Sequence, residues 1–119
     1  MSVLVDTSVW IDHLRKGDDQ LVNLLKHDLV VVHPYVLGEI ACGQLRNREE
    51  ILDSLSGLPQ ARKADDDEIL RFIKANELYG RGIGLVDIHL LASARLDRLQ
   101  LWTRDKRLRE AAEEFELTL

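Results

Sequence analysis

The sequence predicts an α/β fold with a parallel sheet, and two features of the chain indicate it. Three short, mainly apolar runs, at residues 3–6, 29–32 and 99–103, are typical of strands buried in a parallel sheet. The segments between them carry apolar residues at helical spacing. Strand, helices and strand in that order form the crossover that joins parallel strands. We therefore expect helices packed around a short buried sheet.

Length and composition predict one ordinary globular domain spanning residues 1–119. Hydrophobic residues make up 45% of the chain, which is enough for a core, and the formal net charge is −5. The single cysteine, Cys42, lies in an apolar helical run, so we expect a buried thiol in a reducing compartment. No stretch has the form of a signal peptide or a membrane span. These features predict a cytoplasmic protein without a membrane partner.

The first half of the chain is expected to hold four helices. The first follows the strand at once, with Thr7 or Ser8 as its cap, and stops before Gly17. A second helix opens at residues 18–19, and a third runs from about 35 to 45 after a proline at its start. A charged helix over residues 46–55 follows. Residues 56–64 form either a loop or a short edge strand.

The second half contains one acidic run, one glycine-rich loop and two further helices. The acids at 65–68 are interpreted as the first turn of a helix that continues to residue 78, because negative charge favours a helix N-terminus. Residues 79–84 include three glycines and form a loop. A largely buried helix covers 88–96, in which His89 is a surface or packing residue. The last helix covers 107–114, and residues 115–119 form a short final strand.

Four carboxylates occupy special places in this plan. Asp6 and Asp105 follow strand ends, whereas Glu39 and Asp87 lie near helix starts. Since strand carboxyl ends share one edge of a parallel sheet, the four acids can converge there. Glu39 is either a costly carboxylate that needs a partner or cation, or a partly exposed residue at the edge of an apolar face. The alternative interpretation of Asp87 is an acidic residue that only stabilises the first turn of its helix.

Clustered carboxylates repel one another unless protons or cations enter the site. Oxygen ligands without cysteine or paired histidine favour Mg²⁺, with Mn²⁺ as a substitute. Such ions lower the pKa of a water that attacks phosphorus. The hydroxyls of Thr7, Ser8 and Thr103 are candidates to support the ligands. The acids therefore predict metal-dependent phosphate chemistry.

Basic residues gather near the end of the chain. Residues 95–109 hold six of them against Asp97 and Asp105, the six being Arg95, Arg98, Arg104, Lys106, Arg107 and Arg109. A basic rim beside an acidic site would suit a polyanionic substrate. The alternative is a solvated helix face, which the sequence favours equally.

The chain resembles the PIN-domain ribonucleases, and among them the VapC-type toxins of prokaryotic toxin–antitoxin pairs. The resemblance rests on four motifs, which are LVDTSVWIDHL at 4–14, LGEI at 37–40, GLVDIHLLA at 84–92 and LWTRDKRL at 101–108. It implies a three-layer α/β/α sandwich with a short, mainly parallel sheet. It also implies Mg²⁺-dependent cleavage of RNA, frequent homodimers, and neutralisation by a cognate antitoxin in a hetero-oligomer.

The resemblance also assigns the site. The family's acidic quartet, which is both catalytic and metal-binding, corresponds to Asp6, Glu39, Asp87 and Asp105, and its hydroxyl position corresponds to Thr103. Lys106 and Arg107 stand where some members carry a further acid, so the sequence leaves open whether one or two metal ions bind. Two other interpretations are a receiver-type phosphoacceptor domain, which lacks its acid pair and lysine here, and a catalytically silent PIN interaction domain.

Overall fold

The computed structural model describes residues 1–119 and contains a three-stranded parallel sheet in the order β2–β1–β3. The strands are short and are β1 (Val3–Val5), β2 (Val30–Val31) and β3 (Gln100–Trp102). Val3 of the central strand pairs with Val30 on one side and Gln100 on the other. The predicted parallel sheet is therefore confirmed.

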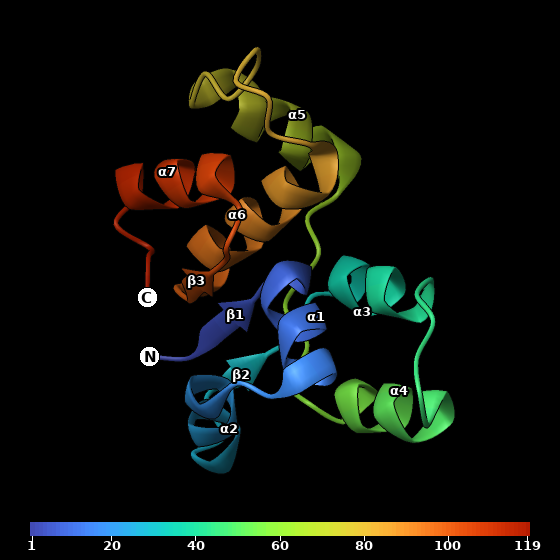
Figure 1. Ribbon diagram of the computed structural model, residues 1–119. Coiled ribbons are helices and arrows are strands. Elements are labelled where there is room, and N and C mark those ends of the chain that lie inside the picture. Colours follow the sequence, from blue (N-terminus) through green and yellow to red (C-terminus); the bar gives the residue numbers. More distant parts are fainter.

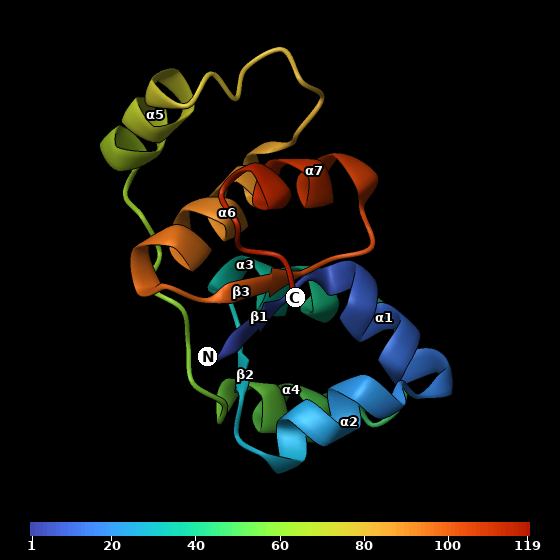
Figure 2. The same ribbon diagram turned by 90° about the vertical axis from the view of Figure 1, so that its left-hand side faces the viewer.

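Seven helices surround this sheet. They are α1 (Thr7–Lys16), α2 (Asp19–Lys26), α3 (Pro34–Ala41), α4 (Arg48–Ser56), α5 (Asp66–Ala75), α6 (Leu85–Asp97) and α7 (Lys106–Glu114). Helices α5, α6 and α7 lie on the β3 side of the molecule, and α2 and α4 lie on the β2 side (Figures 1 and 2). None of the helices is long and apolar enough to cross a membrane. The arrangement agrees with the expected α/β sandwich.

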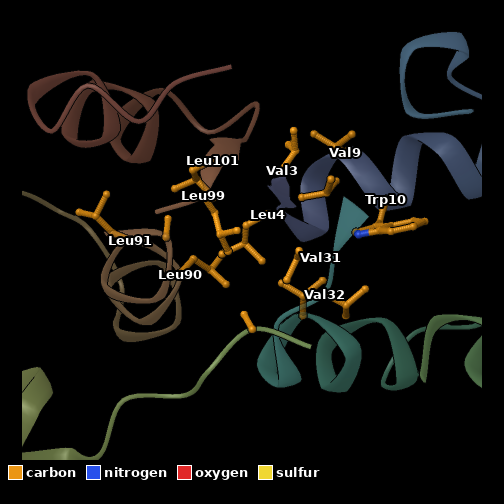
Figure 3. Packing of buried hydrophobic residues seen from close by; sticks show 14 of the residues in the cluster. Val3, Leu4, Val9, Trp10, Val31, Val32, Leu90, Leu91, Leu99 and Leu101 are labelled. Carbon is orange, nitrogen blue, oxygen red and sulfur yellow. The ribbon is translucent and has the colours of Figure 1, made fainter. Parts of the chain in front are cut away.

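Burial explains why the strands have mainly apolar sequences. All three residues of β1 are at most 1% exposed, because helices cover both faces of the sheet. Figure 3 shows Leu4 between Leu90 and Leu91 of α6 on one side and Val9 and Trp10 of α1 on the other. The core thus fixes the start of α1 and the start of α6 relative to β1. Both of these helix starts carry predicted site residues.

Segment 115–119, expected as a strand, and segment 56–64, expected as a loop or a short edge strand, each pair with the sheet at one residue. Gln60 forms an isolated parallel bridge with Val32, and Thr118 forms another with Leu101. The segment 56–64 is therefore a loop after α4 with a single bridge at the sheet edge. The final residues close the β3 edge in the same way, without forming a continuous strand.

Three predictions about helix ends and burial are wrong. The helix expected over 35–45 ends at Ala41, and Cys42 at its C-terminus is exposed rather than buried, because the chain leaves the core there. The helix expected to reach residue 78 ends at Ala75, where the Asn76 side chain donates to the Phe72 carbonyl. Leu78 nevertheless returns to the core and is 1% exposed.

Candidate functional site

Asp6 joins β1 to α1 and is the most constrained of the predicted site residues. It is 5% exposed, and its carboxylate accepts hydrogen bonds from the Thr7 backbone N–H (2.8 Å), Ser8 Oγ (2.8 Å) and Thr103 Oγ1 (2.7 Å). The expectation that Thr7 or Ser8 caps α1 is wrong, since Asp6 itself is the cap. Three donors on one carboxylate hold it in a single orientation at the end of the strand.

Glu39 approaches the same region from α3. It is exposed, which agrees with the edge position that the sequence left open, and its Oε1 accepts a hydrogen bond from Thr7 Oγ1 at 2.7 Å. Thr7 and Ser8 therefore have different partners. Thr7 contacts Glu39, whereas Ser8 contacts Asp6. The first turn of α1 thus links two of the four acids.

The segment 103–105 after β3 resembles the segment after β1, because in both an aspartate caps the helix that follows. Asp105 caps α7 by accepting from the Leu108 backbone N–H at 2.9 Å, and its own N–H donates to Thr103 Oγ1 at 3.0 Å. Thr103 is 2% exposed and, as noted, donates to Asp6. The hydroxyl of Thr103 therefore stands between the two strand-end acids and contacts both of their residues.

Asp87 lies in the first turn of α6 and is partly buried. Burial raises the pKa of its carboxyl from 3.8 to about 6, and the charges of Asp6, Asp105 and Glu39 contribute to this rise in that order. The four predicted acids therefore lie close enough together for Asp6, Asp105 and Glu39 to act on Asp87 electrostatically. They come from four separate parts of the chain, as expected for the carboxyl edge of a parallel sheet.

The donor set suits a hard divalent cation. Four carboxylates offer only oxygen ligands, and the pKa of Asp87 is raised first by burial and then by the charges of the other three acids. No group of three or more histidine, cysteine, aspartate or glutamate side chains lies close enough to hold an ion as placed. Each carboxylate except Asp87 instead holds protein donors. Holding an ion would therefore require these side chains to come closer together.

Three of the six basic residues in the predicted rim make contacts within the protein. Arg104 pairs with Asp12 and Asp18, and Arg109 Nη2 donates to the Thr103 carbonyl at 3.0 Å. The Arg95 guanidinium lies 4.6 Å from the centre of the Phe115 ring. These three arginines thus stabilise the fold around β3 and α7. The observed contacts match neither of the two interpretations of the sequence, which were a uniform basic rim and a fully solvated helix face.

Arg107 connects the glycine-rich loop to α7. Gly82 has φ +75°, and a Cβ placed there would collide with the Arg107 guanidinium. The Arg107 side chain could move away from a Cβ, so it is the positive φ of Gly82, which L side chains rarely adopt, that favours glycine in this loop. The same loop ends at Gly84, which caps the helix that carries Asp87. Arg107 and Lys106 therefore stand beside the acidic site at its α7 end.

A solvent-open cleft of about 730 Å³ adjoins Glu39. Its wall combines apolar residues of α1 with the segment between α3 and α4, and it includes Ile11, Leu14, Ile40 and Leu45. Arg15 and Arg46 also line it. The acidic site is thus bordered on the Glu39 side by a surface that is partly apolar and partly basic.

A buried polar cluster lies next to the site and escaped sequence reasoning. His33 is fully buried, its Nδ1 accepts from the Tyr35 backbone N–H at 3.0 Å, and its ring centroid lies 6.1 Å from that of His89. His89 packs edge-on against Tyr35 at 4.8 Å, so the packing interpretation of His89 is confirmed. Burial and the charge of His89 lower the pKa of His33 to about 4, and burial also lowers the pKa of His89. The pair is therefore neutral at pH 7.

Comparisons with known proteins agree with this architecture. A family model described as PIN domain matches residues 3–114. The chain is 47% identical over 118 residues to "Ribonuclease VapC32" from Mycobacterium tuberculosis, in both the CDC 1551 / Oshkosh and the ATCC 25618 / H37Rv strains. Each alignment covers 98% of this chain and 95% of the relative.

Proposed function

Because the chain belongs to the PIN-domain family, we propose that it is a Mg²⁺-dependent endoribonuclease and the toxin of a toxin–antitoxin pair. Membership of this family replaces the receiver-type interpretation. The relatives carry the name of a ribonuclease, and they align with nearly the whole of this chain. RNA is a polyanion with phosphodiester bonds, which is the substrate class that an acidic, metal-dependent site serves.

The observation that carries this proposal is the effect of three of the acids on the fourth. Burial is the first cause of the raised pKa of Asp87, and the charges of Asp6, Asp105 and Glu39 add to it, which supports a shared site. These four residues would hold the ion, with Mn²⁺ as a substitute for Mg²⁺. A bound Mg²⁺ would supply the Lewis acidity that makes a water nucleophilic at neutral pH and stabilises the leaving oxygen.

The protein's own contribution is to fix the ligands. Thr103 and Ser8 donate to Asp6, and Thr7 donates to Glu39, so hydroxyls restrict the carboxylates without adding charge. A cation bound beside Asp87 would lower the pKa of its carboxyl, because the cation would compensate the charges of the neighbouring acids that help to raise that pKa. Lys106 and Arg107 at the start of α7 are available to attract phosphate.

The partners follow from the same resemblance. A VapC-type toxin would be neutralised by a cognate antitoxin, and we propose this partner together with a homodimer and a toxin–antitoxin hetero-oligomer in the cytoplasm. A small reading frame just upstream of the gene is the expected source of the antitoxin. Co-expression of that frame should relieve growth arrest caused by the toxin, whereas toxicity unaffected by it would argue against the pairing.

Cleavage of RNA by purified protein tests the enzymatic proposal. We expect cleavage with Mg²⁺ or Mn²⁺ and none in EDTA. Asp87→Asn should be inactive, whereas Asp67→Asn, an exposed acid in the first turn of α5, should match the wild type. Cleavage that persists in EDTA would refute the metal mechanism. A protein that binds its antitoxin but never cleaves RNA would instead be a silent interaction domain.

A further inference from the structure

One side chain fastens the segment between β3 and α7 to the first two helices. Arg104 Nη1 donates to Asp12 of α1, and Nη2 donates to Asp18, the cap of α2, at 2.6 Å. The backbone N–H of Arg104 donates to Ser8 Oγ at 3.1 Å. These contacts join parts of the chain that lie 86 to 96 residues apart. No other arginine of the protein pairs with two carboxylates on different elements.

The Arg104 contacts differ from ordinary surface ion pairs. The side chains of Arg104, Asp12 and Asp18 are 34%, 33% and 19% exposed, so water screens them only in part. By comparison, the Arg62–Asp97 pair is 3.8 Å long, and its arginine is 64% exposed. Hydrogen bonds to Asp12 and Asp18 raise the pKa of Arg104. Arg104 is therefore committed to the protein and not to a phosphate of the substrate.

The fastened segment carries two predicted site residues. Thr103 and Asp105 flank Arg104, and Thr103 Oγ1 links Asp6 to the Asp105 backbone. Ser8 Oγ accepts from the Arg104 N–H and donates to the Asp6 carboxylate. The guanidinium thus closes a network that holds the end of β3 against the start of α1. Arg109, which also contacts Thr103, comes from α7 itself and makes no such link to α1.

We propose that Arg104 is a positioning residue of the acidic site, which sets the separation of Asp6 and Asp105 by holding residues 103–105 on α1 and α2. This role rests on the proposed function, since it assumes that the two acids serve one metal-dependent centre. Residues that orient metal ligands typically change metal affinity or activity about 10- to 100-fold when they are replaced. Arg104→Gln should therefore weaken Mn²⁺ binding by roughly that factor.

The test compares four proteins at a temperature where all are folded. They are the wild type, Arg104→Gln, the double variant Asp12→Asn/Asp18→Asn, and the control Arg62→Gln. The Asp18→Asn change keeps the side-chain oxygen that accepts from the Leu21 N–H, so the α2 cap survives. Mn²⁺ affinity is measured by calorimetry, RNA cleavage by kcat and KM, and local opening by hydrogen exchange of residues 103–108 in metal-free protein.

We expect Arg104→Gln and the double variant to show weaker Mn²⁺ binding, lower kcat with little change in KM, and faster exchange at 103–108. The control should match the wild type in all three. Equal Mn²⁺ affinity and kcat in Arg104→Gln and wild type would overturn the positioning role, as would a change confined to KM, which indicates direct RNA contact. A wild type that neither binds Mn²⁺ nor cleaves RNA would instead overturn the proposed function itself.

Discussion

Asp87 and His33 are the two residues whose proton binding changes most between folded and unfolded chain. Burial is the first cause for each, but the signs are opposite. The pKa of Asp87 rises to about 6, and that of His33 falls to about 4. In the metal-free protein, the Asp87 carboxylate thus costs stability at neutral pH, and a charged His33 would cost stability in acid. Each residue allows a prediction about the pH dependence of folding.

Asp87→Asn should stabilise the metal-free protein at pH 7 while abolishing cleavage. The folded-state pKa of about 6 lies above the ordinary 3.8, so the stability from this group is present below 3.8 and lost as pH rises through 6. The gain at pH 7 is at most about 3 kcal/mol. Denaturant unfolding at pH 4 and pH 7 measures it. A variant less stable than wild type at pH 7 would show that the cost of burying the charged Asp87 carboxylate is not the dominant effect there.

The substitution His33→Asn should remove the part of the stability loss in acid that comes from protonating buried His33. The pKa of buried His33 lies near 4, below the ordinary 6.5, so its stability is present above pH 6.5 and falls as pH drops toward 4. Asn can replace the ring as acceptor for the Tyr35 N–H. The stability difference between variant and wild type should shift by about 3 kcal/mol in the variant's favour from pH 7 to pH 4. A difference independent of pH would contradict the buried neutral histidine.

At the scale of the element, the starts of the helices decide what each acid does. Asp6, Asp65 and Asp105 all cap helices with their own carboxylates. Only the first and last of these follow strands of the sheet, and only they lie in the acidic site. The run at 65–68 belongs to α5, where Asp65 and Glu68 form reciprocal hydrogen bonds of 2.7 and 3.0 Å.

Asp65→Ala should therefore change stability and leave catalysis intact. Loss of this cap typically costs about 1 kcal/mol, because the Glu68 backbone N–H loses its acceptor and the reciprocal pair is broken. Thermal unfolding measures the loss, and RNA cleavage per folded molecule should equal that of the wild type. Reduced cleavage by fully folded variant would place the acidic run in the site and contradict its role as a helix start.

At the scale of the whole molecule, the sequence predicted what depends on local pattern. Mainly apolar runs identified the three strands, and an acid close behind a strand end drew attention to Asp6 and Asp105. Helix ends were less predictable, because the apolar pattern continued past Ala41 after the chain had left the core and exposed Cys42. The cap of α1 was misassigned because Asp6, Thr7 and Ser8 are all residue types that cap helices.

Contacts between distant segments were beyond the sequence. The sequence placed Arg104 in a basic rim, and no local pattern indicates that Asp12 and Asp18 would bind its guanidinium. The same holds for Thr7, whose hydroxyl reaches Glu39 from 32 residues away. Such pairs are fixed by the packing of α1 against α3 and of β3 against β1. The role of the four acids together stays a prediction from the resemblance, supported by their mutual charge effects on Asp87.

The most direct test of the account is cleavage of RNA by four single variants, each removing one charge without changing shape. They are Asp6→Asn, Glu39→Gln, Asp87→Asn and Asp105→Asn, compared with wild type and Asp67→Asn at saturating Mg²⁺. We expect each of the four to lose at least about 100-fold in kcat, because one site needs all its ligands. The Asp67→Asn variant should retain full activity. Wild-type cleavage by folded Asp87→Asn and Asp6→Asn would contradict the claim that these carboxylates form the catalytic centre.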